Sequence, residues 1–363
     1  MEGTIIKELA EKKNLQTYIN DTQAKYAAIF WPSLLTKKPV DSLEWKSVIG
    51  DRKAGVAGYV TAFNVSAPEH ARDVLREESG KIPSIRGKRT MDEDLLMKYI
   101  TLTKQIDPDM QRLLDLVYDD VSFCSTAPHK TIDLWLAKLL SSGGYLKFTN
   151  EDNVGMVTQY DVNFGMPDSH KSGTVGEVWS NPAGATPLKD LKTNIFMPLA
   201  DLGVTGGVIR MHPSKVYQLL ESNEVLAKFG MLSKGTTDNL DLNLSKVNSY
   251  LSANEFPTIR AFNASIGVEI DGKVKYSNPW NVDNIVFTPD GPIGKLHVAP
   301  MVEKERPQKQ VTYAEYNGSL VKKFSKVDPV VETTAYEFNA FPSWDTIDQS
   351  FIMNTNRKGS FSS

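Results

Sequence analysis

Residues 283–292, DNIVFTPDGP, join a short apolar run to a Pro-Asp-Gly turn, and a Pro-rich link leads from them to YEFNAFP at 336–342. Apolar and β-branched runs bounded by turn residues are typical of strands. The region therefore predicts strands and turns, and no catalytic constellation accompanies it. We expect its role to be architectural.

Further strands are expected on both sides of this region. Asp271-Gly272 is typical of a two-residue hairpin turn, and apolar and polar residues alternate around it. We expect strands at 284–288, 331–341 and 347–353. The last two are expected to join the sheet of the first domain, because a C-terminal strand needs an existing sheet to pair with.

A long helix is predicted upstream. Apolar residues recur at helical spacing from Met110 to Val121 and again from Ile132 to Leu140. Pro128 separates the two runs and suits the first turn of a helix, so we expect an interruption there. Its second half would run from about 128 to 142 and end at Gly143-Gly144.

A second compact unit of α/β character follows. An apolar stripe predicts a helix over 188–202, and Gly203 is a plausible stop. A strand is expected at 207–211, with a new helix opening at Pro213 or Ser214. The Gly203, Gly206 and Gly207 cluster lies between a helix end and a strand, the wrong order for a dinucleotide fingerprint.

Residues 1–47 are predicted to form an arm, since Pro32 and Pro39 interrupt any long helix. Trp31 and Trp45 lie in a segment too short to bury them by itself. The surface that covers them is either the body of the same chain or a neighbouring subunit.

A strand pair is predicted at 45–49 and 56–65, and residues 66–90 after it are predicted to form a long excursion from the core. Its end is basic, and the helical region 92–120 that follows is acidic. This charge pattern fits either local balance within one subunit or a head-to-tail contact between identical subunits. The predicted intersubunit contact residues are Trp31, Lys81, Arg86, Lys88, Arg89, Asp115, Asp119 and Asp120.

Composition excludes several functional classes. The chain has 363 residues, 40% of them hydrophobic, and a net charge of −3, so no overall attraction to nucleic acid is expected. Its start lacks the pattern of a signal peptide, and no stretch is apolar enough for a membrane span. We therefore expect a protein made and used in a cytoplasm.

No catalytic, cofactor-binding or metal-binding residues are predicted. Cys124 is the sole cysteine, and the five histidines show no metal-binding spacing. A P-loop and a nucleophile elbow are both missing. The acid pairs Asp107/Asp109 and Asp119/Asp120 are better read as an exposed helix face.

The order of these pieces resembles the major capsid proteins of tailed bacteriophages, in particular the lambda-type head protein family (major capsid protein E). The resemblance rests on Phe30-Trp31-Pro32, on Gly176-Glu177-Val178-Trp179, on Asp271-Gly272 followed by Asp283-Asn284, and on Asp328-Pro329. Each motif is weak alone, and the match lies in their order and spacing over nearly the whole chain.

The resemblance implies an α+β fold of the HK97 type. It would comprise a peripheral domain with a long spine helix and a β-sheet, an axial α/β domain, an extended β-hairpin loop and an N-terminal arm. The expected bounds are the arm at 1–47, the extended loop at 48–91, the peripheral domain at 92–185, the axial domain at 186–328, and the return to the peripheral domain with the C-terminal tail at 329–363.

The resemblance also implies a function. The chain would be a major capsid protein that assembles in the host cytoplasm into hexamers and pentamers of an icosahedral virion shell. It would need no cofactor, would meet packaged DNA by non-specific contact, and would not bind a membrane. Other expected partners are a separate scaffolding protein, a portal and, in some relatives, a decoration protein.

Two other functions remain open. An encapsulin-like compartment shell would share the fold. An α/β enzyme would instead have a pocket with convergent titratable groups near residues 260–300. Cross-linking through Lys81 or Lys88 and Asn354 or Asn356 is not expected, because lambda-like relatives do not cross-link.

Overall fold

The computed structural model describes residues 12–22, 28–49, 76–103, 110–148, 161–229, 242–270 and 273–361. The chain divides into two compact units. The first comprises residues 1–45, 79–133 and 295–343, and the second comprises residues 46–78, 134–294 and 344–363. The predicted strand at 56–65 and the Asp271-Gly272 turn lie outside the described residues.

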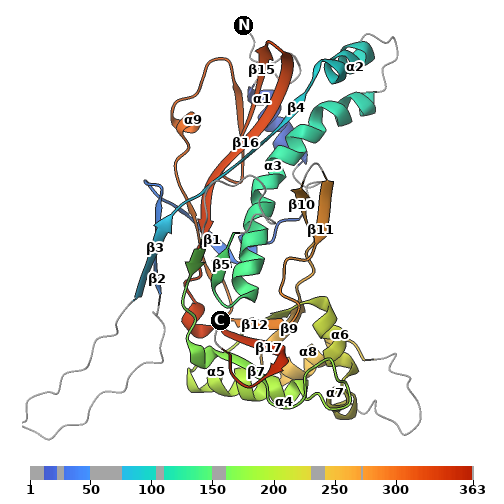
Figure 1. Ribbon diagram of the computed structural model, residues 1–363, viewed down its shortest axis with the longest axis vertical. Coiled ribbons are helices and arrows are strands. Elements are labelled where there is room, and N and C mark those ends of the chain that lie inside the picture. The colour runs from blue at the N-terminus through green and yellow to red at the C-terminus, as the bar shows by residue number, and fades with distance from the viewer. Residues whose placement is uncertain are drawn as a thin grey trace, which may run out of the picture. The chain divides into compact units, whose positions relative to one another are not determined.

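The first unit is built on a sheet with the strand order β1-β13-β16-β15-β14, in which β4 also pairs with β16. In Figure 1, β15 and β16 run together as long ribbons with β4 beside them. The strands are β1 (Leu35–Pro39), β4 (Ser84–Met91), β13 (Gly294–Val298), β14 (Thr312–Tyr316), β15 (Ser319–Val327) and β16 (Val330–Pro342).

Helices cover one face of this sheet. Residues of α1 (Lys12–Thr22), α2 (Glu93–Thr103) and α3 (Met110–Ser141) form a core with β4, β14 and β15. Its buried members are Leu15, Ile19, Met91, Leu96, Tyr99, Val121, Cys124, Ala314 and Val321. The opposite face carries a smaller cluster of Met301, Tyr313 and Leu320 beside α9 (Val302–Glu305). Strand alternation explains why Leu320 and Val321 belong to different clusters.

The predicted interruption near Pro128 was wrong. α3 is one helix of 32 residues with Pro128 inside it, so it begins well before residue 128. An interior proline removes one helical hydrogen bond and disfavours the helix. Packing outweighs that loss, because Val121, Ile132 and Leu136 are fully buried on either side of it. Gly143 and Gly144 end the helix with positive φ, as predicted, and Gly144 N–H donates to the Leu139 carbonyl.

The second unit contains a sheet with the order β7-β17-β12-β8-β9. Its strands are β7 (Lys171–Thr174), β8 (Val208–Met211), β9 (Thr258–Ala261), β12 (Asn284–Thr288) and β17 (Phe351–Lys358). The β8–β9 and β7–β17 pairs are parallel, and β12 is antiparallel to both β8 and β17. The predicted strands at 207–211 and 284–288 are therefore confirmed.

Helices gather along this sheet in Figure 1, where α4, α5 and α8 lie close to its strands. The helical stretch predicted at 188–202 is confirmed as α4 (Pro187–Leu191), a π-helical turn (Lys192–Phe196) and α5 (Met197–Asp201), which follow one another directly. The others are α6 (Pro213–Glu221), α7 (Asn223–Lys228) and α8 (Leu244–Ala253). The apolar faces of these helical segments, α4 to α8, pack against Ile209 and Phe287 of the sheet and bury Leu191, Ile195, Leu219 and Leu251.

The two final strands do not join one sheet, contrary to the sequence-based expectation. β16 lies in the first sheet, whereas β17 pairs with β12 and β7 in the second. Residues 347–349 form a 3₁₀ turn, and the strand begins only at Phe351. Phe351 and Met353 alternate into the helix-covered core, and this burial explains which sheet the strand joins.

Three two-stranded ladders complete the part of the chain that the structure describes. They are β2 (Glu44–Ile49) with β3 (Arg76–Lys81), β5 (Tyr145–Lys147) with β6 (Asp161–Asn163), and β10 (Ile266–Ile270) with β11 (Lys273–Ser277). The last confirms the predicted antiparallel pairing, with Val268 opposite Lys275. Besides the 3₁₀ turn at residues 347–349, the described residues form short 3₁₀ turns at Trp31–Ser33 and Asp168–His170.

Candidate functional site

The basic residues of the predicted extended loop belong partly to a sheet. Residues 84–91 are β4, which pairs antiparallel with β16 over its whole length. Since side chains alternate along a strand, Arg86 and Lys88 lie on one face and Arg89 on the other. The basic segment is thus divided between two faces of the first unit.

Arg89 contacts the acidic helix of its own chain. Its Nη1 lies 2.6 Å from Asp119 Oδ2 and 3.5 Å from Asp120 Oδ1, and its guanidinium lies 3.9 Å from the centre of the Phe123 ring. Burial raises the pKa of Asp120, although the charges of Arg89 and Lys323 oppose the rise. For these three residues the structure favours local charge balance, which the sequence had left open beside an intersubunit contact.

A buried ion pair lies on the same face. Lys323 Nζ is 3.5 Å from Glu332 Oε1, and both side chains have no exposed surface. Lys323 also donates to the Thr334 hydroxyl at 3.1 Å, and the nearby Cys124 thiol contacts the Thr334 carbonyl. Burial lowers the pKa of Lys323 and raises that of Cys124 to about 12, so this thiol is not a nucleophile at neutral pH.

The opposite face of the sheet carries a more exposed polar chain. Arg86 donates to Glu337 at 2.7 Å, and Lys322 lies 3.8 Å from the same carboxylate and 2.5 Å from that of Glu303. Glu303 in turn accepts from the Tyr313 hydroxyl at 3.1 Å. These bonds tie β4, β15, β16 and α9 together.

Trp31 is buried in its own unit, with 1% of its surface exposed. The backbone N–H groups of Phe30 and Trp31 donate to the Asp133 carboxylate at 3.1 and 2.9 Å, and the indole stacks on His129 at 5.9 Å. This placement favours the body of the same chain as the surface that covers Trp31. An intersubunit role for the Trp31 side chain has no support here.

His129 and Asp133 have opposite pKa shifts with one cause. Burial lowers the pKa of His129 to about 4, and burial raises the pKa of Asp133 to about 6. His129 Nε2 donates to the Tyr316 carbonyl at 3.1 Å, which orients the ring and partly opposes the fall in its pKa, while burial keeps the ring neutral. These two residues anchor the Phe30-Trp31 segment to α3.

The remaining predicted contact residues have exposed side chains or side chains outside the described residues. Lys81, at the end of β3, and Lys88, on β4, have exposed side chains. Asp119 keeps 73% of its side chain exposed despite its contact with Arg89. Asp115 lies within α3, and its side chain is outside the described residues.

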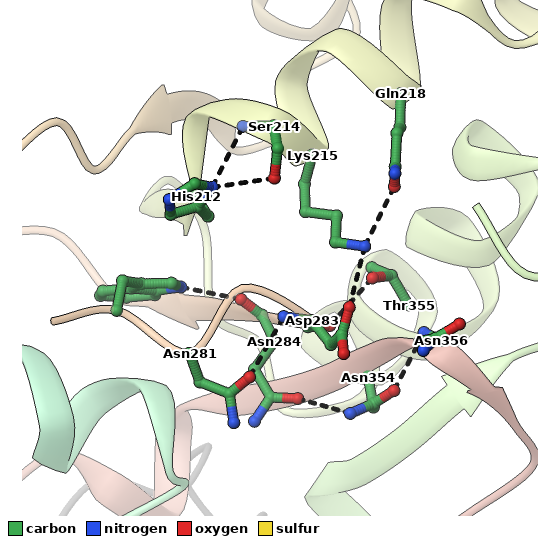
Figure 2. Close-up of polar contacts among 11 residues, drawn as sticks. His212, Ser214, Lys215, Gln218, Asn281, Asp283, Asn284, Asn354, Thr355 and Asn356 are labelled. Atoms are coloured by element: carbon green, nitrogen blue, oxygen red, sulfur yellow. Dashed lines mark hydrogen bonds and ion pairs between the residues drawn. The ribbon is translucent and has the colours of Figure 1, made fainter. Parts of the chain in front are cut away.

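The second unit holds a polar network near the region where an enzyme site was considered (Figure 2). Lys215 Nζ lies 3.0 Å from Asp283 Oδ1 and donates to Gln218 at 3.0 Å. His212 caps α6 by accepting from the Ser214 N–H. The Lys215 ammonium contacts both Asp283 and Gln218, and the His212 ring caps its own helix. These groups therefore stabilise the fold and do not point together toward a substrate.

The same network fastens the C-terminal strand. Asn354 donates to the Asn284 side chain at 2.8 Å (Figure 2). Asn284 donates in turn to the Ser141 carbonyl at 2.7 Å, which joins β17, β12 and the end of α3. Trp280 Nε1 donates to the Asn284 carbonyl. The network thus positions four segments that are distant in sequence.

Within the described ranges, no three His, Cys, Asp or Glu side chains are grouped so as to hold a metal ion. Among the helices that the structure describes, none is long and apolar enough to cross a membrane.

Sequence reasoning missed the buried polar residues, although two signals were present. Asp133 interrupts the apolar stripe of a helix, which often marks a buried acid with a partner. Lys322 and Lys323 are adjacent in a strand, so one of them must point to the covered face. The partners themselves, 103 and 9 residues away, could not be read from spacing.

Comparisons with known proteins identify the fold. No protein-family model matches the chain, and no curated protein matches its sequence. Among solved structures, the putative capsid protein of a prophage of E. coli CFT073 matches 95% of this chain and 98% of its own length, with a TM-score of 0.58 and 14% identity. A phage-related protein from Bordetella bronchiseptica RB50 matches 94% and 96%, with a TM-score of 0.52 and 10% identity.

At these identities the similarity concerns the fold, and it spans both chains almost entirely. It agrees with the mixed α+β architecture and with the long helix and sheet described above. The chain therefore has the α+β fold of phage capsid proteins, the HK97-like fold that the sequence predicted.

Proposed function

We propose that this chain is the major capsid protein of a tailed bacteriophage and that it assembles into hexamers and pentamers of an icosahedral shell around double-stranded DNA. The observation that carries the proposal is the fold similarity to the prophage capsid protein, which covers 95% of one chain and 98% of the other. Similarity over the full length supports a shared role more strongly than a shared domain would, since functions differ among proteins that share only a fold.

We place the chain in the lambda-type branch of these proteins. The support is the order of its sequence motifs, from Phe30-Trp31-Pro32 to Asp328-Pro329. A separate scaffolding protein, a portal and a decoration protein are the partners that such a role would involve, and the shell would place the protein in the virion.

The domain names also belong to this proposal. Residues 92–185 and 329–363 would contribute the peripheral domain and residues 186–328 the axial domain, with the arm at 1–47 and the extended loop at 48–91. The long β16 strand and α3 support a peripheral domain of this kind. The two compact units divide the chain elsewhere, at 133/134, 294/295 and 343/344, so these domain bounds stay a prediction.

Lys88 is the predicted contact residue best placed to meet a neighbouring subunit. Its side chain is exposed on β4, on the face opposite to Arg89. Arg86 remains 62% exposed although it pairs with Glu337. Contacts of this kind are modest individually and gain their effect through repetition by symmetry.

Electron microscopy of the purified protein, alone and with its scaffolding protein, tests the function. We expect closed shells built from hexamers and pentamers. A protein that stays strictly monomeric under every scaffold and salt condition would overturn the proposal. Shells that enclose a cargo enzyme in place of DNA would assign the chain to the compartment-shell alternative.

A charge reversal tests the contact residue separately from the fold. We expect Lys88→Glu to lower the yield of shells by about tenfold or more, because each shell repeats the altered contact many times. Lys189→Glu in α4 is the matched control, since Lys189 is also exposed. Equal yields from the two variants would remove Lys88 from the interface and leave the capsid function untouched.

A further inference from the structure

Two arginines lie side by side on the sheet of the second unit. Arg210 of β8 and Arg260 of β9 are register partners in a parallel pair. Neighbouring strands lie about 4.8 Å apart, so the two side chains start from adjacent positions on one face. Ile209 and Ile259 point to the opposite face, into the core beneath the helices.

Within the described residues, most N–H donors of Arg210 have no hydrogen-bond partner. Its side chain is half-buried, and its Nη1 donates to the Thr288 hydroxyl. Asp290 is the carboxylate whose charge favours the protonated guanidinium, but the two form no ion pair within the described residues. Burial lowers the pKa of Arg210 to about 10, and the like charge of Arg260 adds to that effect.

Such an arrangement is unfavourable without a counter-ion. Like charges at directly paired strand positions repel, and partial burial strengthens the repulsion. Each guanidinium is a planar fork that binds oxyanions through two parallel hydrogen bonds. A phosphate group has enough oxygens to accept from both guanidinium groups at once. Its negative charge, bound between them, would offset their repulsion, and we call this arrangement a clamp.

We propose that Arg210 and Arg260 together bind a phosphate group, either as free phosphate or within a nucleic-acid backbone. Arg260 is exposed at the edge strand of the described sheet, which leaves an approach open from solvent. The Thr288 hydroxyl helps to orient Arg210, because it accepts a hydrogen bond from Arg210 Nη1. The site for free phosphate is independent of the proposed capsid function, whereas the nucleic-acid form rests on it.

Thermal unfolding of the full chain in phosphate and in chloride of equal ionic strength tests the clamp. Phosphate is expected to raise the Tm of the wild type by several degrees, since a ligand that binds only the folded state stabilises it. Arg260→Gln should lose this rise. In chloride its Tm should equal or exceed that of the wild type, because the repulsion is gone.

Arg357→Gln is the matched control, since Arg357 is exposed on β17 in the same unit and the substitution changes the net charge equally. Its phosphate response should equal that of the wild type. A wild type without a phosphate-specific rise, or a control that loses the rise as fully as Arg260→Gln, would overturn the proposal.

Binding measurements distinguish the two sources of phosphate. Calorimetric titration with inorganic phosphate should show about tenfold weaker binding for Arg210→Gln and for Arg260→Gln, with Arg260→Lys between these variants and the wild type. Fluorescence anisotropy with a short DNA duplex at low salt should show the same order if nucleic acid is the ligand. A duplex affinity that is equal in all variants, with phosphate affinity still reduced, assigns the site to free phosphate.

Discussion

On the two faces of the β15–β16 pair, the same residue types are buried to different extents. Lys322 and Lys323 are neighbours in β15 and point to opposite faces, where each meets a glutamate. Lys323 and Glu332 have no exposed surface, whereas Lys322 belongs to a chain of contacts that ends at Arg86, whose side chain is 62% exposed. On the face covered by α3, this ion pair is therefore held without solvent.

The two faces differ in what surrounds a charge that loses its partner. On the covered face, Lys323 has Glu332 and the Thr334 hydroxyl as partners, so removal of one group leaves another charge buried. On the other face, Arg86 and Glu303 keep part of their surface exposed, so water can solvate part of what a substitution leaves unpaired. Ion pairs of the same residue types are therefore expected to have unequal effects on stability on the two faces.

The largest effect is expected for Lys323→Met, which leaves the Glu332 carboxylate buried without its cation. We expect the free energy of unfolding to fall by about 3–5 kcal/mol, as is usual when one member of a buried pair is removed. Denaturant unfolding measures it. The double variant Lys323→Met/Glu332→Leu should recover at least half of the loss, and a double variant as unstable as the single one would contradict a pairwise origin.

A second prediction concerns pH on the covered face. Burial raises the pKa of Asp133 to about 6, so the folded state binds this proton more tightly than the unfolded chain does, and acidification from pH 7 to 4 stabilises the fold through this group. Burial lowers the pKa of His129 from 6.5 to about 4, so acidification over the same range destabilises through this ring. The two contributions oppose each other.

Variants separate these contributions. Relative to the wild type, Asp133→Asn should lose stability more steeply as the pH falls from 7 to 4, and His129→Gln less steeply, by on the order of 1–3 kcal/mol across the range. Chemical denaturation at several pH values measures both slopes. Identical slopes in all three proteins would mean that neither group is held in the protonation state described.

A smaller effect is expected on the α9 side. Lys322→Met removes contacts with Glu303 and Glu337 that solvent partly replaces, so a loss of about 1 kcal/mol is expected. Denaturant midpoints compare it with Lys323→Met directly. A loss as large as that of Lys323→Met would erase the distinction between the two faces.

The smallest effect is expected for Arg86→Gln. Arg86 is mostly exposed, so its contact with Glu337 should contribute no more than about 0.5 kcal/mol. Thermal unfolding should show a shift within a degree or two of the wild type. A loss above about 2 kcal/mol would show that Glu337, which is itself buried, depends on Arg86 alone.

Local patterns predicted most elements of the second unit. The apolar stripe from Leu188, the stop at Gly203 and the helix start at Pro213 all appear where composition placed them. These features depend on neighbours in sequence, because helix caps and stripes are set within a few residues.

For the candidate contact residues, the sequence left the choice of partner open. The sequence marked Arg89, Asp119 and Asp120 as a complementary set, and they do meet, but within one chain. Trp31 was expected to need a covering surface, and α3 of the same unit provides part of it through His129. Charge and hydrophobicity identified which residues need partners, whereas the choice between the same chain and a neighbour depends on chain geometry.

By itself the sequence determined the α+β class, the antiparallel pairing of β10 with β11, the helix ends and the order of motifs that led to a capsid fold. The tertiary structure alone decided that Pro128 lies within one continuous helix, that β16 and β17 belong to different sheets, and that Lys323 is buried while Lys322 is not. The physical reason is that propensities act over a few residues, whereas burial and pairing arise between segments up to hundreds of residues apart. Those long-range contacts are strong enough to override a local preference.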